Sequence, residues 1–210
     1  LFGSSMGEVT APALPWIEWA GFRANFGILG DPLARGMATL VSGVAFLVHI
    51  YSIGYLEKEP CRSRFFAELS FFVFSMLGIV LADNLISMFI FWELVGLSSY
   101  LLIGFWVERP AAGAAANKAF LVNRIGDFGF ILGILGAWAL FGTRSFADLP
   151  SRVAASAPGW AVTAVGLGLF CGCLGKSAQF PLHVWLPDSM EGPTPVSSLL
   201  HAATMVVAGV

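Results

Sequence analysis

Charged residues are scarce in this sequence. Asp, Glu, Lys and Arg make up 11% of its 210 residues, whereas soluble domains carry roughly a quarter. Apolar residues account for 57% of the chain. A chain of this composition cannot cover itself with a polar surface in water, so we expect a lipid-facing exterior. The net charge of −2 also argues against the basic surface that nucleic-acid binding requires.

Cysteine and cofactor motifs are equally scarce. Cys61, Cys171 and Cys173 give neither a disulfide framework nor a zinc site, and the sequence contains no C-x-x-C run for an iron–sulfur cluster. It also lacks a P-loop and a strand-bound G-x-G-x-x-G. The glycine-rich run GLGLFCGCLG lies inside an apolar segment, where close helix packing explains glycine better. We therefore expect that this chain binds no metal or cofactor and performs no electron transfer by itself.

Long apolar runs are abundant instead. Six of them approach the roughly 20 residues that a helix needs to cross a bilayer. They lie at about 33–55, 65–81, 85–106, 114–140 and 160–186, and from about 195 to 210. Because lipid offers no partners to backbone polar groups, these runs should be helical. The predicted fold is an all-α, polytopic transmembrane helix bundle over residues 31–210, truncated at its C-terminus, after an extramembrane loop with short strands at 1–30.

Glu93 and Lys176 are ionisable residues deep inside two of these runs. A charge at a helix centre costs about 2.5–3.5 kcal/mol on insertion scales, so it is rare unless it is functional or paired. Burial disfavours the charged form of a lysine, so Lys176 could exchange protons near neutral pH. We expect the two residues to be electrostatically coupled, with Lys176 carrying the proton and Glu93 controlling it. The alternatives are a structural salt bridge for Glu93 and snorkelling to the interface for Lys176.

The helix that carries Lys176 is predicted to break between Lys176 and Pro181. Pro181 has no N–H, and its ring clashes with the carbonyl of Ser177 four residues earlier. A broken membrane helix is tolerated only where its freed backbone groups are buried in protein or face water. Transporters place such breaks at their ion sites, although a plain structural kink is the alternative.

Further titratable residues interrupt the fourth run and follow the break. His201 lies in the last run, where it could face the buried lysine and relay protons. His183 is nearer a helix end, where an interfacial role fits equally well. Lys118, Arg124 and Asp127 lie in the fourth run, and the last two are spaced to pair on one helical face. That pair could be structural or could neighbour a proton path.

Three stretches of the chain resemble the L-type, or chain-5-type, antiporter-like membrane subunits of NADH:quinone oxidoreductase. They are FFAELSFFVFSMLGIVLADNLISMFIFWELVGLSSYLLIGFW, NKAFLVNRIGDFGF and GKSAQFPLHVWLPDSMEGPTPVSSLLHAATMVVAGV. The resemblance covers nearly all of the chain from about Gly30 onward. The third stretch is typical of the wider antiporter family, whereas FWELVGLSSYLLIGFW together with NRIGDFGF points to the L-type subunits.

The resemblance implies the first half of an inverted-repeat antiporter-like fold, with one discontinuous helix, in a fragment of a longer subunit. It implies proton translocation by Glu93, Lys176 and His201, with Arg124 and Asp127 as a supporting pair. Other membrane subunits of the same complex would be its partners, and those partners would bind NADH, FMN, iron–sulfur clusters and quinone. The resemblance also implies a multi-pass protein of the cell (inner) membrane, with the exit half of the proton path outside this chain.

Two other functions fit the same residues. The large subunit of multisubunit Na⁺/H⁺ antiporters shares KSAQFPLHVWLPDSME, but we expect it to read A-P-T-P where this chain reads G-P-T-P at 192–195. A structural scaffold is the second alternative, in which the buried charges only lock helices together. Sodium uptake would identify the antiporter. Proton pumping that survives the loss of Glu93 and Lys176 would favour the scaffold.

Overall fold

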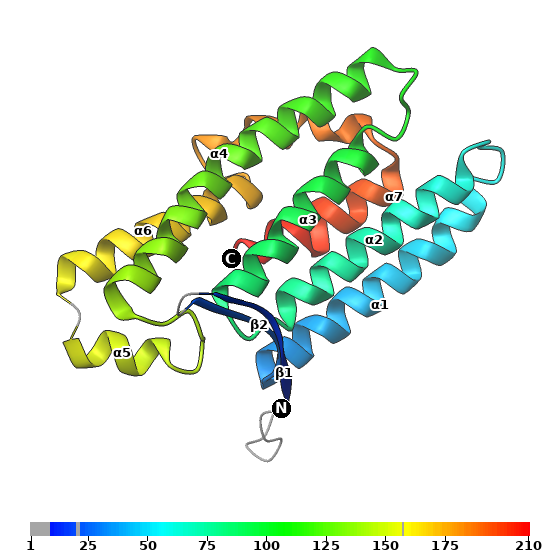
Figure 1. Ribbon diagram of the computed structural model, residues 1–210. Helices are drawn as coiled ribbons and strands as arrows, with labels where there is room; N and C mark the ends of the chain where they lie inside the picture. Colours follow the sequence, from blue (N-terminus) through cyan, green and yellow to red (C-terminus); the bar gives the residue numbers. More distant parts are fainter. Residues whose placement is uncertain (1–8, 20–21, 157) are drawn as a thin grey trace.

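The computed structural model describes residues 9–19, 22–156 and 158–210 (Figure 1). Its two strands are β1 (Val9–Trp19) and β2 (Phe22–Gly30). The helices that follow are α1 (Pro32–Tyr55), α2 (Arg62–Val80), α3 (Leu85–Ile103), α4 (Pro110–Phe141), α5 (Leu149–Ser156) and α6 (Gly159–Lys176). The chain continues in short pieces, η1 (Leu182–Trp185), η2 (Asp188–Glu191), α7 (Thr194–Ser197), η3 (Ser198–Ala203) and α8 (Met205–Ala208).

Five helices, α1, α2, α3, α4 and α6, are long and apolar enough to cross a membrane. They correspond to the first five predicted runs, so the predicted all-α bundle is confirmed. Side-chain caps set where two of them begin. The carboxylate of Asp31 accepts a hydrogen bond from the N–H of Ala34 at 2.6 Å, at the start of α1. The Asn84 side chain accepts from the N–H groups of Ile86 and Ser87 at the start of α3.

The outer faces of these helices are apolar. Phe46 and Leu47 on α1 are each 65% exposed, and Phe128 on α4 is 67% exposed. A protein surface of this kind is stable against lipid and not against water. The exposed apolar faces and the five spanning helices together make this chain a multi-pass membrane protein.

The sixth predicted run does not form one helix of membrane-crossing length. Its residues form α7, η3 and α8 in succession, and η3 is π-helical. At Thr204 the hydroxyl donates to the carbonyl of Leu199, five residues earlier, at 2.7 Å. A hydroxyl that bonds the backbone in this way competes with the regular helical pattern. The apolar composition of the run carries no sign of this competition, so the sequence predicts one continuous helix.

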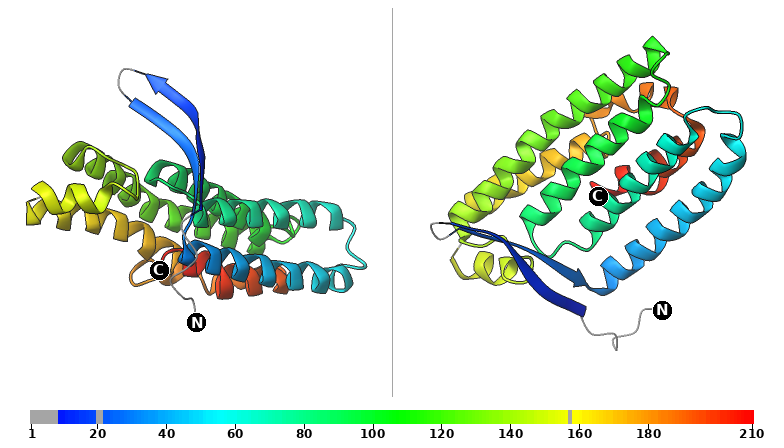
Figure 2. Two further views of the ribbon diagram at one scale, coloured as in Figure 1. Left: turned by 90° about the horizontal axis from the view of Figure 1, so that it is seen from below. Right: turned by 45° about the vertical axis from the view of Figure 1, so that its right-hand side comes forward.

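β1 and β2 form an antiparallel hairpin that projects away from the helices (Figure 2). The N–H of Gly27 donates to Asp83 Oδ1 at 3.2 Å, and the Asn84 side chain donates to the carbonyl of Asn25 at 2.9 Å. These bonds attach the hairpin to the turn between α2 and α3. The short strands expected within residues 1–30 are therefore present, and their position outside the membrane stays a prediction.

α4 and α6 lie side by side and approach each other at backbone distance (Figure 1). A Cβ on Gly168 of α6 would lie 2.7 Å from the Cα of Gly133 on α4, and one on Gly126 would lie 3.0 Å from the Cα of Gly175. Only glycine allows this approach, so the interpretation of the glycine-rich run as a packing surface is confirmed. The contact also fixes the position of Lys176, which directly follows Gly175.

α6 ends at Lys176, as the sequence predicts. The N–H of Ala178 bonds to the carbonyl of Gly175 at 3.3 Å, and the N–H of Gln179 bonds five residues back at 3.0 Å. This pair of bonds is the Schellman arrangement of a helix C-terminus, which needs a left-handed residue; Ala178 supplies it with φ 49°. Pro181 lies beyond the helix, after a cis peptide bond. The helix therefore ends before the expected proline clash can act.

Candidate functional site

Charged side chains from three helices come together in the bundle, where Asp127 and Lys176 are buried and the side chains of Glu93 and Arg124 are 24% and 40% exposed. Glu93 lies on α3, Arg124 and Asp127 lie on α4, and Lys176 is the last residue of α6. α4 packs against both α3 and α6, so it brings the three sets of charges to one region. The sequence analysis predicted these residues as members of a proton path, and the structure shows how they pair.

Glu93 forms an ion pair with Arg124. The guanidinium also lies over the ring of Phe120, 4.7 Å from its centroid. The salt bridge named as the alternative for Glu93 is therefore present, and the electrostatic coupling of Glu93 to Lys176 stays a prediction. Arg124 pairs with Glu93 and not with Asp127, although its spacing permits a pair within α4. Residues three apart on a helix are near enough to pair, but a carboxylate on the neighbouring helix competes for the same guanidinium.

Asp127 is bound by Trp92 instead. Its carboxylate oxygen Oδ1 accepts a hydrogen bond from Trp92 Nε1 at 2.6 Å, and both residues are 2% exposed. The Trp92 ring packs against Phe130, with 4.9 Å between ring centroids. This bond joins α3 to α4 inside the bundle.

Lys176 is 1% exposed. Its Nζ lies 5.8 Å from the centroid of the Trp92 ring and 2.8 Å from the position that a Cβ on Gly96 would take. Gly96 therefore leaves the space that the ammonium group occupies. Nζ has no hydrogen-bond partner in the part of the chain that the structure describes, and the charges acting on it are those of Asp127 and Arg124. Burial this deep rules out snorkelling to an interface.

His201 is connected to the end of α6 through Trp185. Its Nε2 pairs with Ser189 Oγ at 3.1 Å, and its ring lies edge-on to Trp185, with centroids 5.8 Å apart. Trp185 is fully buried and donates its Nε1 hydrogen to the carbonyl of Gly175 at 3.0 Å. No direct hydrogen bond joins His201 to Lys176, whose Nζ has no hydrogen-bond partner among the described residues, so the expected relay between them stays a prediction.

Lys118 and His183 lie at the periphery. Lys118 Nζ pairs with Asp188 Oδ2 at 2.6 Å and joins α4 to η2, and the two side chains are 42% and 48% exposed. His183 is exposed and stacks on Phe180, with ring centroids 5.9 Å apart. Neither residue belongs to the buried cluster, and the exposure of His183 fits the interfacial alternative.

Sequence reasoning missed Trp92, Gly96 and Trp185. Trp92 directly precedes Glu93, and Gly96 lies four residues after Trp92, so a hydrogen-bond donor and a gap share one face of α3. That spacing was the available signal, but it does not say which side chain fills the gap. Trp185 follows the break, where helical periodicity no longer applies.

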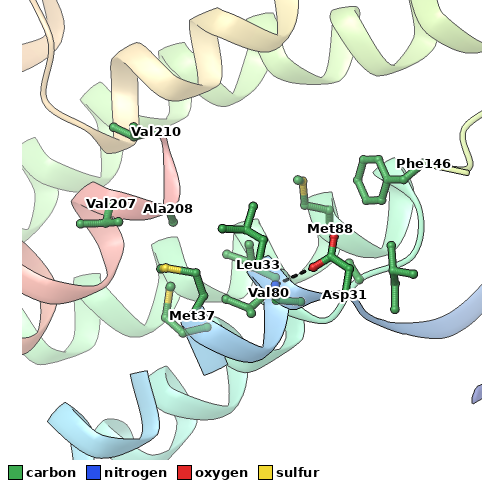
Figure 3. Close-up of a pocket in the computed structure, with 14 residues that line it drawn as sticks. Asp31, Leu33, Met37, Val80, Met88, Phe146, Val207, Ala208 and Val210 are labelled. Carbon is green, nitrogen blue, oxygen red and sulfur yellow. Dashed lines mark hydrogen bonds between the residues drawn. The ribbon is translucent and has the colours of Figure 1, made fainter. Parts of the chain in front are cut away.

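A cavity of about 500 Å³ lies apart from these charges, and none of them lines it (Figure 3). Its walls are mainly apolar and include Leu33, Met37 and Met88. Asp31 also lines it, but its carboxylate caps α1. Across the described ranges, no three His, Cys, Asp or Glu residues gather as a metal site. The buried cluster around Lys176 is therefore the candidate functional site.

Two family models match this chain. The model described as NADH:quinone oxidoreductase/Mrp antiporter, TM, matches residues 82–210. The model described as NADH-Ubiquinone oxidoreductase (complex I), chain 5 N-terminus, matches residues 16–66. The first match includes every residue of the buried cluster.

Curated relatives are similar over most of the chain. NAD(P)H-quinone oxidoreductase subunit 5 of the Paulinella chromatophora organellar chromatophore is 52% identical over 200 residues, which cover 93% of this chain and 30% of that protein. NADH-quinone oxidoreductase subunit L of Mycobacterium tuberculosis is 50% identical over 195 residues, which cover 93% of this chain and 31% of that protein. This chain therefore spans less than a third of the length of either relative.

A solved structure shares the fold. A chain of the Mrp complex from Dietzia sp. matches with a TM-score of 0.83 and 29% sequence identity, over 96% of this chain and 22% of that chain. The similarity therefore extends across nearly the whole chain.

Proposed function

We propose that this chain is part of a proton-translocating L-type subunit, because it belongs to the NADH:quinone oxidoreductase/Mrp antiporter family. In that role it couples NADH oxidation and quinone reduction in partner subunits to proton movement across the cell (inner) membrane. The names of the relatives support this choice, because both are subunits of a quinone oxidoreductase. NADH, FMN, the iron–sulfur clusters and the quinone are assigned to the partners.

The proposal rests on the position of Lys176. It is an ammonium group buried at the broken end of a membrane helix, without a hydrogen bond among the described residues. Such a group is held in its charged form by the field of nearby charges and not by direct bonds, so a change in that field can move its proton. Transporters place their ion sites at broken helices, and the end of α6 is such a place.

In this scheme the Glu93–Arg124 pair determines whether Lys176 keeps its proton. While Glu93 holds Arg124, the carboxylate of Asp127 is free to stabilise charged Lys176. When Glu93 takes up a proton, Arg124 turns toward Asp127, three residues away on the same helix. Lys176 then passes its proton toward the exit half of the path, which is expected outside this chain. A unit charge at about 4 Å contributes about 4 kcal/mol at an effective dielectric of 20. Moving one charge against 100 mV needs about 2.3 kcal/mol, so the field of one pair is large enough to gate the step.

Substitution of Lys176 in the full-length subunit, assembled in its complex, tests this function. Arginine keeps the charge but cannot release it, so Lys176→Arg should stop proton pumping as completely as Lys176→Ala. Lys118→Arg is the matched control, since the peripheral Lys118 pairs at the surface and should tolerate the exchange. Reconstituted vesicles with a pH-sensitive dye give the pumping rate, and native gel electrophoresis reports assembly. Normal pumping by Lys176→Arg would show that the proton travels elsewhere.

A sodium–proton antiporter is the second candidate, because the matching solved structure is an Mrp complex. The two candidates differ in cargo and partners. Sodium uptake into vesicles that contain the purified full-length protein, without redox partners, would support the antiporter. Co-purification with subunits that oxidise NADH would support the quinone oxidoreductase.

A further inference from the structure

We infer that the apolar cavity between α1, α2, α3 and α8 holds an acyl chain of a bilayer phospholipid. The cavity measures about 500 Å³, within the range of roughly 300–1,000 Å³ that is typical of ligand pockets (Figure 3). Its walls come from these four helices, from the end of β2 and from the chain that follows α4. None of the buried charges lines it, so the inference does not depend on the proposed function.

The walls of the cavity suit hydrocarbon better than water. Asp31 carries the one polar side chain among the described residues that line it, and its Oδ1 already accepts the N–H of Ala34 at 2.6 Å. A buried water needs several polar partners, and apolar cavities stay dry. An empty space of this size would leave the lining side chains without packing contacts, and protein interiors hold few such voids. An apolar ligand is therefore the content that fits.

The cavity is continuous with the lipid-facing surface of the bundle. Leu33 lines it and is 74% exposed, and Val207 on its α8 side is 39% exposed. The outer faces of the spanning helices adjoin hydrocarbon, so an acyl chain can enter sideways without crossing water. The chain leaves one apolar environment for another and gains no desolvation energy. Its gain is the packing contact with cavity walls that would otherwise face a void.

Methionine side chains make the walls adaptable. Met37, Met76 and Met88 are three of the six methionines in the sequence, and they approach the cavity from three different helices. An unbranched, polarisable side chain adjusts to a partner that changes shape, as a flexible acyl chain does. A rigid ring system would instead need placed polar groups to set its orientation. Among the described lining residues only Asp31 has one, and it caps α1, so a flexible hydrocarbon chain is favoured.

The polar end of the cavity sets the direction of the lipid. Asp31 and Arg35 lie at the beginning of α1, where Arg35 Nε donates to the Asp31 carbonyl at 3.4 Å. The 24 residues of α1 extend over about 36 Å, enough to cross a hydrocarbon core of about 30 Å, so its first turn reaches the headgroups. Asp31 and Val207 lie on opposite sides in Figure 3. The headgroup therefore lies beside Asp31, and the acyl chain extends toward Val207.

A phospholipid with a diazirine midway along one acyl chain tests the inference. The full-length subunit in its complex is reconstituted into phosphatidylethanolamine vesicles that contain this probe, irradiated and digested, and mass spectrometry locates the labels. The partly buried Met88 on α3 should be labelled together with the lipid-facing Phe46. Met37→Trp fills the cavity and should remove the label from Met88 but not from Phe46. Leu47→Trp is the matched control on the lipid face of α1 and should leave both labels in place.

A second variant, Val80→Phe, fills the cavity from α2 if Met37→Trp does not assemble. A Met88 label that survives in a filled variant, or one that is missing from the unmodified full-length protein, would overturn the inference. Vesicles that also contain an excess of a long-tailed quinone identify the ligand. An unchanged Met88 label supports the phospholipid, whereas its loss would assign the cavity to the quinone tail and overturn the inference. Lys176→Ala should be labelled like the unmodified protein, because the site does not depend on proton pumping.

Discussion

Gly133→Ala tests the backbone contact between α4 and α6. A Cβ on Gly133 would lie 2.6 Å from the backbone nitrogen of Leu169 and 2.9 Å from the carbonyl carbon of Gly168. Non-bonded heavy atoms prefer about 3.5–4.0 Å, so the helices would have to separate by roughly 1 Å. The obstructing atoms belong to the backbone and cannot rotate away. Overpacking of this kind costs about 1–3 kcal/mol, which lowers the folded-to-unfolded ratio by roughly 5- to 150-fold.

Gly166→Ala is the matched control on α6. A Cβ at Gly166 meets no atom within 4 Å in the described structure. Alanine is favoured over glycine in a helix interior by about 1 kcal/mol, so this substitution should be neutral or stabilising. Unfolding of the detergent-solubilised full-length subunit by SDS, followed by circular dichroism, gives both free energies. Equal stability of the two variants would refute the reasoning from the glycine contact.

Ala178→Gly should stabilise the subunit by about 1 kcal/mol in the same unfolding assay, because alanine is strained in the left-handed conformation that ends α6; an unchanged midpoint would contradict this. Lys118→Met and Asp188→Asn should each change stability by less than about 1 kcal/mol, with a double-mutant coupling of similar size, since the pair is half exposed. A larger coupling would mean that other side chains depend on it. Glu93→Gln should impair proton pumping and quinone-linked turnover without blocking assembly, which native gel electrophoresis reports; wild-type pumping by this variant would contradict the role of Glu93 in control.

The long helices could be predicted because apolar length and end signals lie along the chain itself. In the structure, Asn84 caps α3 and Pro32 is the first residue of α1, so both boundaries carry a local signal in the sequence. The break after Lys176 was also predictable, although its cause is the left-handed Ala178 and not the proline clash. A conformation of that kind leaves no composition signal when the residue is alanine.

Side-chain partners were harder to predict, because they depend on how helices rotate against one another. The spacing of Arg124 and Asp127 permits a pair within α4, but Glu93 from α3 reaches Arg124 and Trp92 reaches Asp127. The irregular chain after the break is the extreme case. It places Trp185 between the end of α6 and His201, and no periodic pattern in the sequence predicts that position.

The glycine contact also determines which parts of the site can move. Helices that meet backbone to backbone cannot slide or roll past each other without first separating, so α4 and α6 behave mechanically as one body. Asp127 and Lys176 belong to that body, so the packed backbones of α4 and α6 limit the distance between them. Glu93 and Trp92 sit on α3, outside it. A displacement of α4 therefore moves Asp127 and Lys176 together relative to α3, and the Lys118–Asp188 ion pair joins the same body to η2.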